Sequence, residues 1–378
     1  MDYISALPNG IRSRRIDNGN GLIMHVLEAG RPQDPCVLLL HGFPELAYSW
    51  RKVMLPIAQA GYYVIAPDQR GYGRTTGWDP RYHGDLWQFR ILNIVCDAMG
   101  LISALGRDHV AAVFGHDFGS FVAGFCALLR PDVFRSLALM SAPFAGTAPL
   151  PFDSVNKPQH TAPDIHAALA ALPRPRKHYQ WYYSMPQADR DMWQCAQGVH
   201  DFLRAYYHHK SADWKQNQPH PLAGWQAEEL AKMPTYYIMD LAETMAEAVA
   251  HEKPSAAEIA ANTWLPDEEL AVYAAEYGRI GFQGGLQWYR NMTSFRQHSE
   301  LSIFAGRNVE VPSIYVAGKS DWGIYQRPGV FERMCNTFLT DMRGCHLIDG
   351  AGHWVQQEQA QGVSEILCDF LQQTRKRA

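Results

Sequence analysis

The stretch Gly115-His-Asp-Phe-Gly119 holds a single carboxylate between two glycines, directly after the apolar run 110–114. The run predicts a buried strand, and the apolar stretch 120–129 predicts a helix. A strand joined to a helix through such a turn is typical of a nucleophile elbow, whose small flanking residues let the backbone bend sharply and expose the central side chain. We therefore predict that Asp117 is a nucleophile. The alternative is an aspartate that caps the helix, although a cap does not require glycine on both sides.

An imidazole and a second carboxylate also follow predicted strands. His353 lies in the loop 351–358 and Asp321 in the loop 317–323. An imidazole titrates near neutral pH and can act as a general base, and a carboxylate can orient it and stabilise its charged form. The chain order of nucleophile, acid and histidine is the order that enzymes with this elbow use. We predict His353 as the base and Asp321 as its partner, with Asp349 as the rival acid.

Backbone N–H groups near the elbow are candidates to stabilise a negative oxygen. The stretch His41-Gly-Phe-Pro-Glu45 comes directly after the apolar run 35–40. A strand that ends in a glycine turn can direct N–H groups at a developing oxyanion, and the residue after the nucleophile commonly supplies the second donor. The predicted donors are the N–H groups of Phe43 and Phe118.

These side chains need a sheet that brings several strand ends to one edge. Predicted strands alternate with predicted helices, which favours right-handed crossovers and a mainly parallel sheet. From about 144 to about 290 the alternation stops, and a segment rich in Trp, Tyr, His and Pro predicts helices without a buried strand. The strands are predicted over 21–28, 35–40, 62–66, 110–114, 134–140, 311–317 and 344–348, and the helices between them over 48–60, 86–105, 120–129, 328–334 and up to about 373.

Bulk composition predicts a large globular chain and excludes several classes of partner. The 378 residues are 47% hydrophobic and 19% charged, and a net charge of −4 offers no basic surface to nucleic acid or lipid. No signal peptide and no stretch of roughly 20 apolar residues is evident, so a soluble cytoplasmic protein without membrane insertion is expected. The seven cysteines form no Cys-x-x-Cys pair and no His-Glu-x-x-His is present, so we predict neither a disulfide framework nor a metal site.

Several motifs together resemble the α/β-hydrolase superfamily and, within it, the epoxide hydrolases. The resemblance implies an α/β-hydrolase fold, with a mostly parallel central sheet flanked by helices and a helical lid inserted after the sixth strand. The core would comprise residues 1–146 and 296–378, and the lid, called the cap below, residues 147–295. The motifs are His-Gly-Phe-Pro-Glu at 41–45, Tyr48-Ser-Trp50, the stretch 68–73, Gly-His-Asp-Phe-Gly at 115–119 and Gly-His-Trp-Val-Gln-Gln-Glu at 352–358.

The same resemblance implies roles for individual residues. The family's nucleophile, acid and base map onto Asp117, Asp321 and His353. Two cap tyrosines that bind the epoxide oxygen map onto Tyr179 and Tyr273, whereas aromatic residues of such helices otherwise pack on the core. The residue after the nucleophile is often tryptophan in this family and is Phe118 here.

The resemblance thus implies an epoxide hydrolase that converts a lipophilic epoxide and water to a vicinal diol through an alkyl ester on Asp117, without a metal or organic cofactor. Three indoles are predicted to line an apolar substrate pocket, those of Trp181, Trp322 and Trp354. A haloalkane dehalogenase would share the nucleophile but needs ring N–H donors for the halide, and Phe118 cannot be one. A catalytically silent ligand-binding member of the fold is a further alternative. A homodimer is one of the oligomeric states that remain open.

Overall fold

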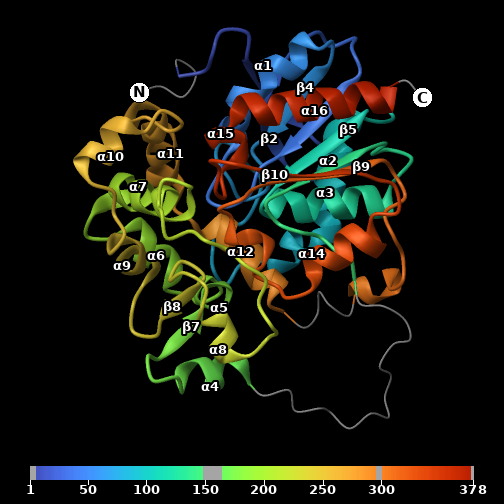
Figure 1. Cartoon of the computed structure of the whole chain (residues 1–378). Helices are drawn as coiled ribbons and strands as arrows, with labels where there is room; N and C mark the ends of the chain where they lie inside the picture. The colour runs from blue at the N-terminus through green and yellow to red at the C-terminus, as the bar shows by residue number, and fades with distance from the viewer. Residues whose placement is uncertain (1–5, 148–163, 295–299, 376–378) are drawn as a thin grey trace.

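An eight-stranded sheet with the order β1-β2-β4-β3-β5-β6-β9-β10 forms the centre of the computed structural model, which describes residues 6–147, 164–294 and 300–375 (Figure 1). The pairs β1–β2 and β2–β4 are antiparallel, and the remaining pairs in this order are parallel. The mostly parallel sheet is confirmed. The strands are β1 (Arg12–Asp17), β2 (Ile23–Ala29), β3 (Cys36–Leu40), β4 (Tyr63–Pro67), β5 (Ala112–His116), β6 (Leu137–Met140), β9 (Ser313–Gly318) and β10 (Met342–Ile348).

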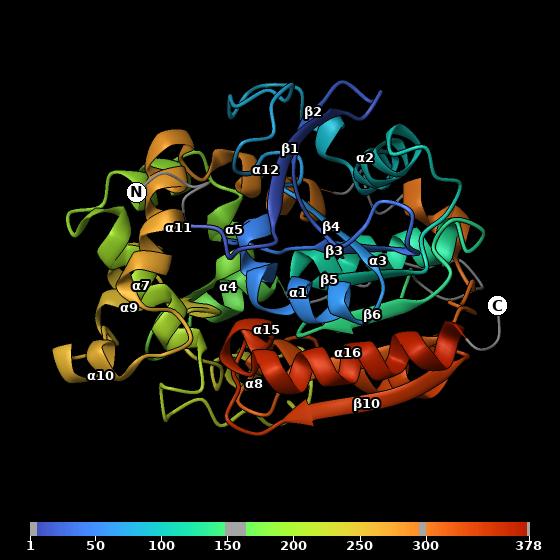
Figure 2. The same ribbon diagram turned by 90° about the horizontal axis from the view of Figure 1, so that it is seen from above.

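Helices flank this sheet. Those of the core are α1 (Arg51–Gln59), α2 (Ile91–Ala104), α3 (Phe118–Leu129), α14 (Val330–Arg333), α15 (Val355–Glu358) and α16 (Ala360–Arg375), with short turns η1 (Ala47–Trp50), η2 (Leu86–Phe89), η3 (Ser302–Phe304), η4 (Trp322–Ile324) and η5 (Met334–Phe338). Figure 1 shows α1 and α16 above the sheet and α3 and α14 beneath it. Seen from above in Figure 2, α1 lies beside α16, which it contacts.

The strand β1 is not predicted by the hydrophobic pattern, because its sequence Arg-Ser-Arg-Arg-Ile-Asp is mostly charged. It pairs only with β2, at the edge of the sheet, so its polar side chains can reach solvent. Arg12 Nε and Arg14 Nη1 lie 3.1 and 3.3 Å from the carboxylate of Glu28 on β2. Charged side chains on an edge strand also discourage pairing with another chain.

Close backbone packing explains the glycines on both sides of Asp117. A Cβ atom on Gly115 would lie 2.0 Å from the carbonyl oxygen of Gly119, and one on Gly119 would lie 2.0 Å from that of Leu40. Asp117 itself has φ 52° and ψ −117°, a conformation that L-residues rarely adopt. The chain therefore turns from β5 into α3 through a bend that larger neighbours would obstruct.

The cap follows β6, the sixth strand, and lies beside the sheet in Figure 1. A short antiparallel pair, β7 (Arg176–His178) with β8 (Ile238–Asp240), is missing from the prediction, because three residues are too few to show a periodicity. The predicted end of the cap at residue 295 lies outside the described residues. The cap helices are α4 (Ile165–Ala170), α5 (Tyr179–Tyr183), α6 (Ala188–Trp193), α7 (Gly198–Lys210), α8 (Ala227–Leu230), α9 (Met245–Ala250), α10 (Ala256–Ala261), α11 (Asp267–Ile280) and α12 (Gln283–Met292).

Candidate active site

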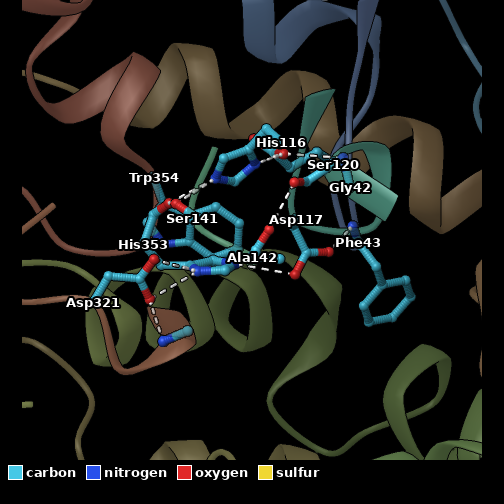
Figure 3. A network of polar contacts seen from close by, with 12 residues as sticks. Gly42, Phe43, His116, Asp117, Ser120, Ser141, Ala142, Asp321, His353 and Trp354 are labelled. Atoms are coloured by element: carbon cyan, nitrogen blue, oxygen red, sulfur yellow. Dashed lines mark hydrogen bonds and ion pairs between the residues drawn. The ribbon is translucent and has the colours of Figure 1, made fainter. Parts of the chain in front are cut away.

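Three strand ends bring Asp117, His353 and Asp321 together (Figure 3). Asp117 follows β5, Asp321 lies after β9, and His353 lies in the loop after β10. The Nδ1 atom of His353 is 3.1 and 3.2 Å from the two carboxylate oxygens of Asp321. Its Nε2 atom is 3.3 Å from Oδ2 of Asp117, without the alignment of a hydrogen bond. The buried imidazole therefore lies between two buried carboxylates.

Asp321 is the acid that contacts the imidazole, and its rival is not. Oδ1 of Asp321 also accepts a hydrogen bond from the N–H of Gly323 at 2.7 Å, which fixes the carboxylate. The Asp349 side chain is 84% exposed and pairs with Lys319 at 2.8 Å. An exposed carboxylate with a lysine partner cannot orient a buried imidazole.

A backbone hydrogen bond fixes the carboxylate of Asp117. Oδ1 accepts a hydrogen bond from the N–H of Phe43 at 3.0 Å, and the side chain makes no capping hydrogen bond to α3. Burial alone would raise the pKa of Asp117, but the neighbouring imidazole of His353 and the charges of Lys210 and His116 hold it well below its ordinary range. Asp117 is therefore ionised at neutral pH.

A second buried pair lies behind the nucleophile. His116 Nδ1 is 2.6 Å from Oε2 of Glu45, and Nε2 is 2.6 Å from the carbonyl oxygen of His353 (Figure 3). Both neighbours can only accept, so both ring nitrogens carry protons. Burial alone would lower the pKa of His116, but the Glu45 carboxylate raises it. The imidazolium thus links β5, the strand before Asp117, to the loop that carries His353.

Side chains that follow His353 in the sequence fix the same loop. Oε1 of Glu45 accepts hydrogen bonds from the amides of Gln356 at 2.9 Å and Gln357 at 3.1 Å. The Glu358 carboxylate accepts from the N–H groups of Gly352 and Trp354, each at 2.9 Å. The motif Gly-His-Trp-Val-Gln-Gln-Glu therefore supplies three of the side chains that hold its own loop.

A cavity of about 520 Å³, its open mouth included, leads to Asp117. Tyr179 lies in its wall; its hydroxyl donates to Oε1 of Gln326 at 3.0 Å and accepts from the amide of Gln180 at 3.2 Å. Burial and then the charge of Asp117 raise the pKa of Tyr179 well above its ordinary value, so the phenol keeps its proton. The lining residues are Asp117, Phe118, Phe121, Ala142, Pro143, Tyr179, Gln180, Tyr289, Met292, Gly323, Ile324, Gln326, Arg327 and Val330.

The structure does not bring Tyr273 to this cavity. Its hydroxyl lies 2.8 Å from Oγ of Ser49 and 3.2 Å from Oε1 of Gln357, and it accepts from Arg51 Nη1 at 3.4 Å. These partners belong to the contact between α11 and the core. Tyr273 therefore occupies the alternative position considered above, in which a cap tyrosine packs on the core.

Tyr289 on α12 is a wall residue that sequence reasoning missed. Its ring centroid lies 5.9 Å from that of Tyr179 and 4.8 Å from that of Phe118. Among the described residues its hydroxyl has no hydrogen-bond partner, and burial, Tyr179 and Asp117 raise its pKa well above the ordinary value. The sequence offers one signal for Tyr289, its place in the stretch 281–290 that follows the segment of the predicted Tyr273.

None of the three predicted pocket indoles lines the cavity. Trp181 packs against the ring of His178, with centroids 5.0 Å apart, and Trp322 against that of His220 at 4.9 Å. Trp354 is fully buried, and its Nε1 donates to the carbonyl oxygen of Tyr207 at 2.9 Å. The three indoles therefore pack against neighbouring residues outside the cavity. The aromatic rings that line the cavity are those of Phe118, Phe121, Tyr179 and Tyr289.

Two structural features of other classes of protein are absent from the described residues. No set of three His, Cys, Asp or Glu side chains is arranged there to hold a metal ion. In the same residues, no helix has both the length and the apolar character needed to cross a bilayer.

Comparison with known proteins places this geometry in a family. Residues 35–360 match the model of the alpha/beta hydrolase fold. The chain is 31% identical to "Epoxide hydrolase A" of Mycobacterium tuberculosis over 96% of this chain and 98% of that protein. It is 30% identical to an epoxide hydrolase of Caballeronia sordidicola over 98% and 96% of the two chains. The chain belongs to the epoxide hydrolase family.

Solved structures of this family have the same fold. An epoxide hydrolase from an endophytic Streptomyces superposes with a TM-score of 0.77 at 28% identity, over 98% of this chain and 97% of that one. Epoxide Hydrolase A from Mycobacterium thermoresistibile has a TM-score of 0.73 at 32% identity, over 96% and 98% of the two chains. The predicted fold class is thereby confirmed for this member of the epoxide hydrolase family.

Proposed function

We propose that the protein hydrolyses an epoxide to a vicinal diol through an ester on Asp117. The observation that carries the proposal is an ionised carboxylate at a cavity that also presents the protonated phenol of Tyr179. Relatives over nearly the whole chain are named epoxide hydrolases, which supports the same activity. The aromatic and aliphatic lining favours a lipophilic epoxide.

In the first half-reaction, Oδ2 of Asp117 attacks one carbon of the oxirane. A bond forms between Oδ2 and that carbon, and the carbon–oxygen bond of the ring breaks. The released oxygen takes a proton from a phenol of the cavity wall, and proton donation of this kind contributes about 10²- to 10⁴-fold to a rate. An ionised carboxylate needs no base for this attack, so His353 is free for the next step.

In the second half-reaction, water attacks the ester carbonyl carbon of Asp117. Nε2 of His353 takes a proton from the water, and Asp321 stabilises the charged imidazole. Oδ1 becomes the oxyanion, held by the N–H of Phe43 and, in our proposal, by that of Phe118. The tetrahedral intermediate then collapses with cleavage of the bond between the carboxyl carbon and Oδ2, and the imidazolium of His353 returns its proton to the departing diol oxygen. The remaining proton of the added water passes to the phenolate left by the first half-reaction, which restores both the carboxylate and the phenol. Water and side chains supply every atom and proton, so the scheme needs no cofactor.

A single turnover in H₂¹⁸O, with enzyme in excess over styrene oxide, tests this scheme. Because the first diol takes its new oxygen from Oδ2 of Asp117, we expect it to be unlabelled and the peptide that contains Asp117 to gain ¹⁸O. Label in the first diol would contradict the ester and favour direct attack by water. Release of halide from a bromoalkane would support a dehalogenase, and saturable binding without turnover a silent ligand-binding protein.

We further propose that the hydroxyls of Tyr179 and Tyr289 share the leaving oxygen. Both phenols line the cavity, whereas that of Tyr273 is engaged with Ser49 and Gln357. We expect Tyr179→Phe and Tyr289→Phe each to slow ester formation by about 10²-fold, and Tyr273→Phe to slow it less than tenfold. Rapid-quench measurement of the ester gives these rates. A larger loss in Tyr273→Phe than in Tyr289→Phe would return the second role to Tyr273.

Partners, location and assembly complete the proposal. The substrate and water are the small molecules with which the enzyme acts, and we propose a cytoplasmic location. A homodimer is the proposed assembly, and light scattering on the purified chain measures its mass directly.

A further inference from the structure

Lys210, the last residue of α7, is a buried cation that the reaction scheme does not use. The residue is 3% exposed. Its Nζ lies over four aromatic rings, 4.9 Å from the centroid of Tyr237, 5.3 Å from Trp354, 5.4 Å from Tyr206 and 5.7 Å from Tyr236. Among the described residues no carboxylate forms an ion pair with it. Lysine is almost never fully buried without a partner, so this position calls for a compensating charge nearby.

The compensating charges are those of the active site. Lys210 interacts electrostatically with Asp117, Asp321 and Glu45, and its charge lowers the pKa of both Asp117 and Asp321. Burial lowers the pKa of Lys210 itself, and the three carboxylates oppose that effect. The aromatic faces add favourable cation–π contacts, which are strongest for desolvated cations.

Backbone contacts hold the cation in place beside the catalytic loop. The carbonyl oxygen of Lys210 accepts the N–H of His353 at 2.9 Å. The Trp354 ring is one of the four rings that face the ammonium group, and its centroid lies 4.7 Å from that of the His353 ring. The cap helix α7 and the catalytic loop therefore meet at this lysine.

We propose that Lys210 is a positioning residue whose buried ammonium group balances the two acidic side chains of the triad and keeps them ionised. Glu45 has the imidazolium of His116 as a direct partner, whereas Asp117 and Asp321 share the imidazole of His353. Loss of the lysine charge favours the protonated form of every titratable group that faces it. Those groups are Asp117, Asp321 and Glu45, with His353 and His116 in contact with them. Lys210 acts through these groups, since it does not line the cavity.

The pH dependence of Lys210→Met tests this proposal, which rests on the proposed function. With styrene oxide as substrate, we measure the rates of ester formation and of ester hydrolysis against pH. In each profile we expect the acid limb, where the rate falls with falling pH, to lie about one pH unit higher than in the wild type. Lys210→Arg keeps the charge and is expected to keep the wild-type limbs. The matched control is Lys177→Met, because Lys177 also lies over a tyrosine ring, 4.9 Å from the centroid of Tyr182, but interacts with the charges of Asp191, Glu243 and Glu247 instead of those of the triad.

Unchanged acid limbs in folded Lys210→Met would overturn the proposal, and so would an equal shift in Lys177→Met. Circular dichroism and thermal unfolding establish whether each variant is folded. If the methionine variant does not fold, Lys210→Gln provides the same loss of charge with a polar side chain. Failure of the wild type to form any diol would contradict the proposed function instead, so the two failures are distinguishable.

Discussion

Replacing His353 with alanine is expected to stop the reaction at the alkyl ester and leave one adduct per enzyme on the peptide that contains Asp117. Asp117 keeps its hydrogen bond from the N–H of Phe43 and the nearby charges of Lys210 and His116, so ester formation is expected to continue. Hydrolysis loses its base, because Nε2 of His353 is the ring nitrogen that faces Asp117. We expect kcat to fall by about 10²- to 10⁴-fold. Intact-mass and peptide mass spectrometry after mixing with styrene oxide measure the adduct.

Asp117→Asn is the matched control for this experiment, because it keeps the shape of the side chain and removes its charge. We expect neither adduct nor turnover from it. Asp321→Asn should give partial accumulation, since the base remains but loses the carboxylate that orients it. Turnover at the wild-type rate in His353→Ala, or an adduct on a peptide without Asp117, would exclude the two-step scheme.

The residues at strand ends could be predicted from the sequence because each follows a short, self-contained pattern. Asp117 is marked by its flanking glycines, and the structure shows why: a Cβ at Gly115 or Gly119 would clash with backbone oxygens. Asp321 and His353 each follow an apolar strand, and a parallel sheet gathers such ends at one edge. Local sequence and sheet geometry together therefore suffice to bring these three side chains into contact.

The cavity wall could not be predicted in the same way, because it depends on how the cap packs. Tyr273 and Tyr289 lie on consecutive helices, and the hydrophobic pattern of either helix fits a buried tyrosine. Only the packing of α11 on Ser49 and of α12 beside Phe118 decides which hydroxyl meets the cavity. The indole of Trp354 is misleading for the same reason: its chain position is next to the base, but its ring packs on Tyr207.

The pair of Glu45 and His116 stabilises the fold over a defined pH range. Burial alone would raise the pKa of Glu45 and lower that of His116, but each charge reverses the effect on the other. The contribution of Glu45 is fully present above its ordinary value of 4.5 and is lost as pH falls through its lowered pKa. That of His116 is fully present below its ordinary value of 6.5 and is lost as pH rises through its raised pKa. Both contributions are complete between these two ordinary values.

Glu45→Gln is therefore expected to destabilise the protein most between pH 4.5 and 6.5. Removing one partner of a buried pair lowers the free energy of unfolding by about 3 kcal/mol. This difference between the wild type and Glu45→Gln should shrink above the raised pKa of His116. Urea denaturation at several pH values measures it. Asp349→Asn is the control, because it breaks an exposed pair and should leave the denaturation midpoint unchanged. A loss that is equal at every pH would mean that Glu45 acts only as an acceptor for Gln356 and Gln357, and that His116 carries no buried charge.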